Sequence, residues 1–115
     1  MNARRTAVVR TISGAARIVV YKVRSPESDL TVESDTALVT FDNLGDCIVS
    51  PGPGSTAVVV LEQSVRIKNV LPYIVGELLV NENQKVTVRD RQSPAAPITV
   101  SPDERRRYLV NFRTR

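Results

Sequence analysis

The stretch AVVVLEQSVRIK, residues 57–68, decides the fold class of this chain. Its apolar side chains recur on odd-numbered positions, and the polar ones in its second half fall on even-numbered positions. Successive side chains of a strand point to opposite faces, so this period of two predicts one long strand, or two strands in line with a bulge near Gln63. The apolar residues at odd-numbered positions are Ala57, Val59, Leu61, Val65 and Ile67, and the polar residues at even-numbered positions are Glu62, Ser64, Arg66 and Lys68.

The rest of the chain has the same β character. Valine, isoleucine and threonine supply 34 of the 115 residues (19 Val, 6 Ile and 9 Thr), and such β-branched side chains favour strands over helices. Ser-Pro pairs stand beside candidate strands and mark their ends, because proline has no N–H to donate to a ladder. Further strands are predicted at residues 6–12, 16–24, 30–32, 37–41, 47–49, 73–80, 85–89, 98–100 and 108–112.

Short strands with turn residues between them predict a single all-β domain over residues 1–115. We expect an antiparallel sandwich or a jelly-roll-like barrel of about eight strands, with a strand order that local pattern does not fix. Residues 81–84 (NENQ) are interpreted as a four-residue hairpin loop.

One helical signal interrupts this pattern near the C-terminus. Ser101, Pro102 and Glu104 form a capping box, with serine as the N-cap and proline in the first helical position. The alternation at residues 108–112 favours a strand instead. We therefore expect at most one short helical turn near residues 102–107.

The composition argues against catalysis. Histidine is absent, which excludes Ser-His-Asp and Cys-His catalysis and His-ligated zinc. Cys47 has no second cysteine to pair with and follows an acidic residue, so we expect a buried, inert thiol. The acidic residues of positions 27–35 are interpreted as a solvated loop, with a cation site or carboxylate catalysis as alternatives. We expect no enzyme, cofactor, metal or small-molecule substrate.

No stretch approaches the roughly 18–20 consecutive apolar residues of a membrane span, so no membrane partner is expected. The first 24 residues hold six basic residues and no acid, a composition that also fits a mitochondrial transit peptide. The alternation at residues 17–24 favours a strand there, and no apolar region follows Arg4 and Arg5. We therefore expect a protein that is not secreted through a signal peptide.

Charge is segregated along the chain. The net charge of +4 combines +6 over residues 1–24, −6 over residues 25–88 and +4 over residues 89–115. Three interpretations remain open: the basic ends bind nucleic acid, they contact the acidic middle of another copy, or they pair with that middle inside one chain or are simply solvated. Few aromatic residues support nucleic-acid binding. Because arginine pairs carboxylates bidentately at protein interfaces, contact between copies is favoured.

The favoured function is a non-enzymatic structural or assembly protein, in its most specific form a virion component such as a capsid decoration (cement) protein or a head–tail or tail component. The alternatives are a small β-barrel that binds nucleic acid through its basic termini, and an adaptor whose edge strand receives a peptide. The expected partners are copies of the chain or a larger protein shell, in a virion or in the cytoplasm of the producing cell. Short basic arms at residues 1–5 and 113–115 would reach these partners. The candidate contacts are Arg4, Arg5, Arg10, Arg105, Arg106, Arg107, Arg113 and Arg115, and the candidate acidic counter-surface is Glu27, Asp29, Glu33 and Asp35.

Overall fold

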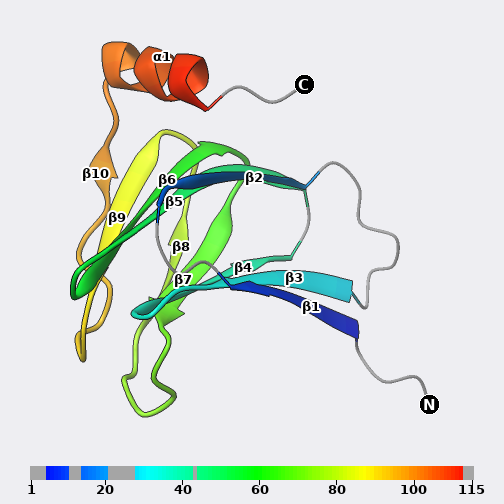
Figure 1. Cartoon of the computed structure of the whole chain (residues 1–115), viewed down its shortest axis with the longest axis vertical. Helices are drawn as coiled ribbons and strands as arrows, with labels where there is room; N and C mark the ends of the chain where they lie inside the picture. Colours follow the sequence, from blue (N-terminus) through cyan, green and yellow to red (C-terminus); the bar gives the residue numbers. More distant parts are fainter. Residues whose placement is uncertain (1–4, 11–13, 21–27, 43, 113–115) are drawn as a thin grey trace.

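The computed structural model describes residues 5–10, 14–20, 28–42 and 44–112, with the backbone alone for residues 5–10 and 28–29. Two five-stranded sheets lie face to face as a sandwich (Figure 1). Sheet A contains, in spatial order, β1 (Arg5–Arg10), β3 (Ser28–Glu33), β4 (Ala37–Phe41), β7 (Val65–Asn69) and β8 (Glu77–Val80). Sheet B contains β10 (Ile98–Thr99), β9 (Gln84–Arg89), β6 (Ser55–Glu62), β5 (Gly45–Gly52) and β2 (Ala16–Val20). Neighbouring strands are antiparallel except β1 and β3, which are parallel. The predicted all-β sandwich is confirmed.

The helix α1 (Pro102–Asn111) corrects the prediction for the end of the chain. In place of one short turn near residues 102–107 and a strand at 108–112, the helix continues to Asn111. Tyr108 and Phe112 are four residues apart, a spacing that places them on one face of a helix as well as on one face of a strand. Both pack on the outer face of sheet B. This tertiary contact, together with the capping box, decides between the two periods.

The main hydrophobic core fills the space between the two sheets. Phe41 of β4 and Ile67 of β7 are among its largest members, and Cys47 lies in it without exposed surface. Burial, and next the charge of Asp46, raises the pKa of the Cys47 thiol far above its usual value. Gly45 leaves room for the Phe41 ring, since a Cβ atom at that position would lie 2.7 Å from it. The prediction of a buried thiol is confirmed. The other buried members are Val32, Ala37, Val39, Val49, Val58, Val60, Val65, Val80, Val86 and Val88.

The quoted stretch forms two strands that belong to different sheets. β6 lies in sheet B and β7 in sheet A, and between them Gln63 has a φ of 65°, in the left-handed region. Val59 and Leu61 therefore face α1, while Val65 and Ile67 face the core between the sheets. The expectation of a common face for these odd-numbered residues is wrong, because the change of sheet reverses which parity points inward.

The predicted hairpin at residues 81–84 is also wrong. β8 and β9 belong to different sheets, so this turn joins the two layers instead of two paired strands. Asn83, with a φ of 66°, donates its backbone N–H to the oxygen of Val60 at 2.8 Å and so ties the turn to β6. Val80 and Val86, on either side of the turn, are both buried in the core from opposite sheets.

Candidate interaction surface

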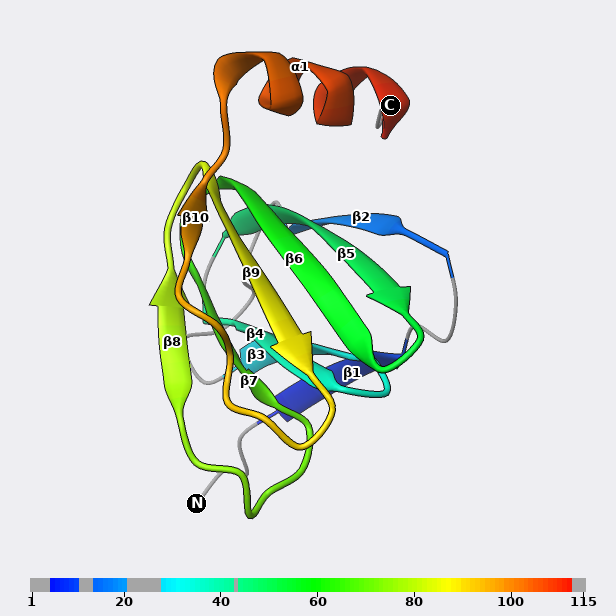
Figure 2. The same cartoon turned by 90° about the vertical axis from the view of Figure 1, so that its left-hand side faces the viewer.

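α1 lies over sheet B (Figures 1 and 2), and a second, smaller apolar cluster lies between the helix and the outer face of that sheet. A row of residues runs in register across the sheet and forms the base of this cluster. Tyr108 and Phe112 pack against the cluster and are half-buried, and no residue of α1 is fully buried. The row is Arg17, Ile48, Val59, Lys85 and Ile98, and the buried members of the cluster are Ile48, Val59, Leu61 and Val100.

Arg105 holds the first half of α1 onto the sheet. The helix begins after Ser101, whose side chain accepts a hydrogen bond from the backbone N–H of Glu104 at 3.1 Å. One turn further, Arg105 Nη1 donates to the backbone oxygen of Leu61 and to Asn83 Oδ1, both at 2.6 Å. Hydrogen bonds from a charged donor are roughly twice as strong as neutral ones. This guanidinium, predicted as a contact to another molecule, thus supports the fold of its own chain.

Arg17 holds the other end of α1. Its Nε donates to Asp46 Oδ1 at 2.9 Å and its Nη2 to Asp46 Oδ2 at 2.5 Å, and the two side chains are only 14% and 6% exposed. Its Nη1 donates to the backbone oxygen of Phe112 at 2.9 Å. The last carbonyl groups of a helix lack intrahelical donors, and the helix dipole favours a cation there. Arg17 supplies both a donor and a positive charge.

The side of α1 that faces away from the sheet is exposed. Successive helical residues are about 100° apart, so Arg106 and Val110 lie about 160° from Tyr108 and point away from it, while Arg107 lies about 100° from Tyr108 on the flank of the helix. All three are exposed, Val110 to 53%. Arg106 Nη1 lies 3.9 Å from Asp103 Oδ1, whereas Arg107 forms no ion pair with any residue that the structure describes. We call Arg106, Arg107 and Val110 the outer face of α1.

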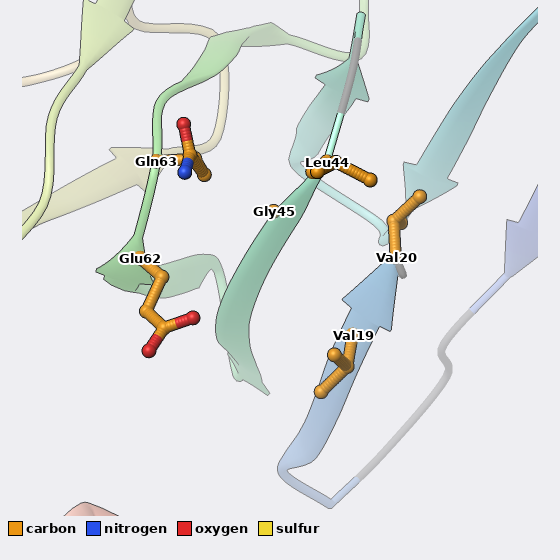
Figure 3. Close-up of a pocket in the computed structure, with 6 residues that line it drawn as sticks. All are labelled: Val19, Val20, Leu44, Gly45, Glu62 and Gln63. Atoms are coloured by element: carbon orange, nitrogen blue, oxygen red, sulfur yellow. The ribbon is translucent and has the colours of Figure 1, made fainter. Parts of the chain in front are cut away.

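A pocket of about 160 Å³ opens on sheet B beside the Arg17–Asp46 pair. In register across the sheet, Asp46 lies opposite both Val19 and Glu62. Figure 3 shows the valines and Leu44 on one side of the pocket and Glu62 with Gln63 on the other. Glu62 is exposed, and its carboxylate has no hydrogen bond or ion pair within the described part of the chain. The pocket therefore combines apolar walls with one available carboxylate. Its lining residues are Val19, Val20, Leu44, Gly45, Glu62 and Gln63.

The structure places the remaining predicted contact residues on sheet A or leaves them out. Arg5 and Arg10 are the end residues of β1, and Asp29 and Glu33 belong to β3. β1 pairs with β3 so that the backbone of Arg10 lies opposite that of Glu33. Asp35 is exposed, Glu33 is half-buried, and neither carboxylate is free of a partner. Arg4, Glu27, Arg113 and Arg115 lie outside the described residues.

A basic and an acidic segment thus run side by side within one chain at β1 and β3. Pairing between the charged side chains of these two strands stays a prediction, because the structure describes only the backbone of residues 5–10. Arg106 and Arg107 differ, because α1 lies over sheet B and the acidic residues of β3 lie in sheet A (Figure 1). Their role as contacts to another molecule stays a prediction.

Sequence reasoning missed the Arg17–Asp46 pair and the pocket. The pair has a sequence signal: each residue is a charge beside apolar strand residues, and a buried charge needs a partner. Glu62 has no such signal. Its place beside Val19 depends on the order β6-β5-β2, which local pattern does not show.

Among the described residues, no three Cys, Asp or Glu side chains lie close enough together to bind one metal ion. In the same residues, no helix is long and apolar enough to cross a membrane. The expectation that the chain is not an enzyme stays a prediction.

No protein-family model matches the chain, and no curated protein sequence does. Two crystal structures of a protein from Parabacteroides distasonis, described as a "putative anti-sigma factor", have similar folds. Both have a TM-score of 0.61 over 89% of this chain, with 13% and 14% sequence identity. This chain spans 46% of the length of those chains. At this level of identity the likeness establishes a shared fold.

Proposed function

We propose that this chain is a non-enzymatic domain that binds another protein through the outer face of α1. The observation that carries the proposal is the way α1 is presented. Arg105 and Arg17 hold the helix to sheet B from below, which leaves Arg106, Arg107 and Val110 exposed above. A fixed element loses little conformational freedom when a partner binds it.

The composition of this face fits a protein partner. Arginine is enriched at protein interfaces because its planar fork pairs carboxylates, and its stem covers apolar surface. Val110 lies within one turn of both Arg106 and Arg107, so apolar and charged contacts can be made together. A partner with an acidic surface is the best match.

The structural neighbour is consistent with this class of function. An anti-sigma factor is named for acting on a sigma factor, which is itself a protein. This chain shares the fold of part of that neighbour, and we extend to it only the general activity of binding a protein.

The virion component expected from the sequence is one specific form of this proposal, with copies of the chain or a larger shell as the partner. Its location in a virion or the cytoplasm of the producing cell stays a prediction. The nucleic-acid alternative also stays a prediction. Proteins that bind single strands stack bases on exposed aromatic side chains, whereas Tyr108 and Phe112 pack against sheet B.

Site-specific photo-crosslinking in the producing cell tests the proposal. A photoreactive phenylalanine analogue replaces Val110 in one strain, and the exposed Gln92, in the loop after β9, in a control strain. We expect one discrete protein adduct from position 110 and none from position 92, and the substitutions R106E and R107E together should remove it. Adducts to nucleic acid, or none at position 110, would contradict a protein-binding role for this face.

A further inference from the structure

The pocket on sheet B has the chemistry of a site for one basic side chain. Glu62 lines the pocket, and Asp46, which lies opposite Glu62 across the sheet, is already paired with Arg17. Glu62 is exposed and has no hydrogen bond or ion pair within the part of the chain that the structure describes. A cation from another molecule can therefore pair with Glu62 without displacing a partner.

The size of the pocket fits the stem of such a side chain. Its volume of about 160 Å³ is well above what one water molecule needs, so the pocket can admit the end of an unbranched lysine or arginine side chain. Val19, Val20 and Leu44 provide apolar walls for the methylene groups, and Glu62 lies across from them (Figure 3). Long basic side chains bury their stems in this way while the charged end stays near water.

We propose that this pocket accepts Arg107 from a second copy of the chain, in a dimer with two-fold symmetry. The proposal rests on the proposed function and identifies the bound protein as a copy. Arg107 is exposed and forms no ion pair among the described residues, whereas Arg106 lies near Asp103. A guanidinium and a carboxylate can form two parallel hydrogen bonds. The outer face of α1 and the pocket are thus complementary in charge and in apolar surface.

The placement of the two features favours two-fold symmetry. α1 ends close to the pocket, since Arg17 contacts both Phe112 and Asp46, and Asp46 lies opposite the lining residues Val19 and Glu62 in sheet B. A two-fold axis through this surface can place α1 of each copy over the pocket of the other, so that the contact occurs twice and the assembly closes. β9 ends at Arg89, and this end of the strand is remote from α1 (Figure 2). A contact between the exposed Arg89 and the pocket would be head-to-tail and open-ended.

Charge exchange tests this contact with the purified chain. Sedimentation velocity over a range of protein and NaCl concentrations should show a monomer–dimer equilibrium that weakens with salt. We expect E62R and R107E each to raise the dimer dissociation constant by at least about tenfold, because each variant places like charges together at both contacts. The double variant E62R/R107E restores the opposite charges and should return to within about threefold of the unmodified chain. The matched controls D90R and R91E make the same changes of charge at exposed positions remote from α1 and should leave dimerisation unchanged.

Each outcome bears on the proposal. Loss of dimer in both single variants with recovery in the double variant supports it, provided that circular dichroism shows all variants folded. Monomers at every concentration, assemblies that keep growing, or a double variant that stays monomeric would each overturn it. Those results leave the proposed function standing if the photo-crosslink from position 110 joins this chain to a different protein, so the two proposals can fail separately.

Discussion

The core between the sheets and the layer formed by α1 are held together by different interactions. Among the residues that the structure describes, thirteen from both sheets are buried in the core. Under α1, four residues are buried and none of them belongs to the helix. Buried apolar area stabilises by about 25 cal/mol per Å², so the core carries most of the free energy of folding. The attachment of α1 depends on Arg17 and Arg105 beside the smaller apolar contact of Tyr108 and Phe112, so it should be possible to release the helix without unfolding the sandwich.

The largest effect is expected from the core. Phe41→Ala removes a fully buried ring from β4 and should lower the free energy of unfolding by about 3–5 kcal/mol, through lost transfer energy and the cavity left behind. Urea denaturation followed by circular dichroism measures this loss. Val110→Ala, on the exposed outer face of α1, is the control and should change stability by less than about 0.5 kcal/mol. Equal effects of the two substitutions would contradict the contrast between core and helix layer.

The Arg17–Asp46 pair connects the two layers and should come next. Asp46→Ala leaves the guanidinium of Arg17, only 14% exposed, without its carboxylate, which should cost about 3 kcal/mol. The double variant Arg17→Met with Asp46→Leu removes both charges and should recover most of that loss. The same denaturation experiment measures both variants. If the double variant is as unstable as Asp46→Ala, packing at these positions matters more than the uncompensated charge.

Arg105→Ala should have a smaller and more local effect. It removes the charged hydrogen bonds to Leu61 and Asn83, a loss of about 1.5–3 kcal/mol that falls on the attachment of α1. Hydrogen exchange should show faster exchange of the α1 amides, while Cys47 in the core stays unreactive toward a thiol reagent. Arg106→Ala, whose side chain is exposed, is the matched control. A Cys47 thiol that becomes reactive in Arg105→Ala would show that helix and sandwich open as one unit.

The same division separates what the sequence predicts from what it does not. Strands in which every second side chain is buried, such as Ala37–Phe41, were predicted at their observed positions. This alternation is a local property of the sequence. The course of the chain at Gln63 and at residues 81–84 was predicted wrongly. The same turn residues can connect two paired strands of one sheet or carry the chain from one sheet to the other. The strand expected at 108–112 failed for a related reason: a spacing of four residues fits both periods, and only the apolar surface under Tyr108 selects the helix.

The candidate site shows the same limit. Three adjacent arginines, at positions 105–107, look the same in the sequence. Each residue of a helix is rotated by about 100° from the one before it, so only the side chain of Arg105 reaches the backbone oxygen of Leu61. Glu62 was one acid among several in the middle of the chain. Its pocket exists only because β2, β5 and β6 are neighbours in sheet B.

Alkaline pH should produce the smallest effect and should act on the helix layer through Tyr108. Burial, followed by the hydrogen bond that the hydroxyl donates to Glu104 Oε2 at 2.9 Å and the charge of that carboxylate, raises the pKa of Tyr108. A raised pKa in the folded state means that the protonated form is favoured there. The resulting stabilisation is complete below the ordinary tyrosine pKa of about 10 and is lost as the pH rises through the higher folded value.

Near-UV circular dichroism measures α1 docking above pH 10, where the intrinsic rate of hydrogen exchange is itself too strongly dependent on pH. The pKa of Cys47 is also raised, so ionisation of this thiol should lower the stability of the core at high pH. The variant Tyr108→Phe separates the two groups. It should abolish the change in the aromatic signal and leave the unfolding of the sandwich at higher pH. An unchanged aromatic transition in Tyr108→Phe would contradict the assignment of the pH-sensitive group to Tyr108.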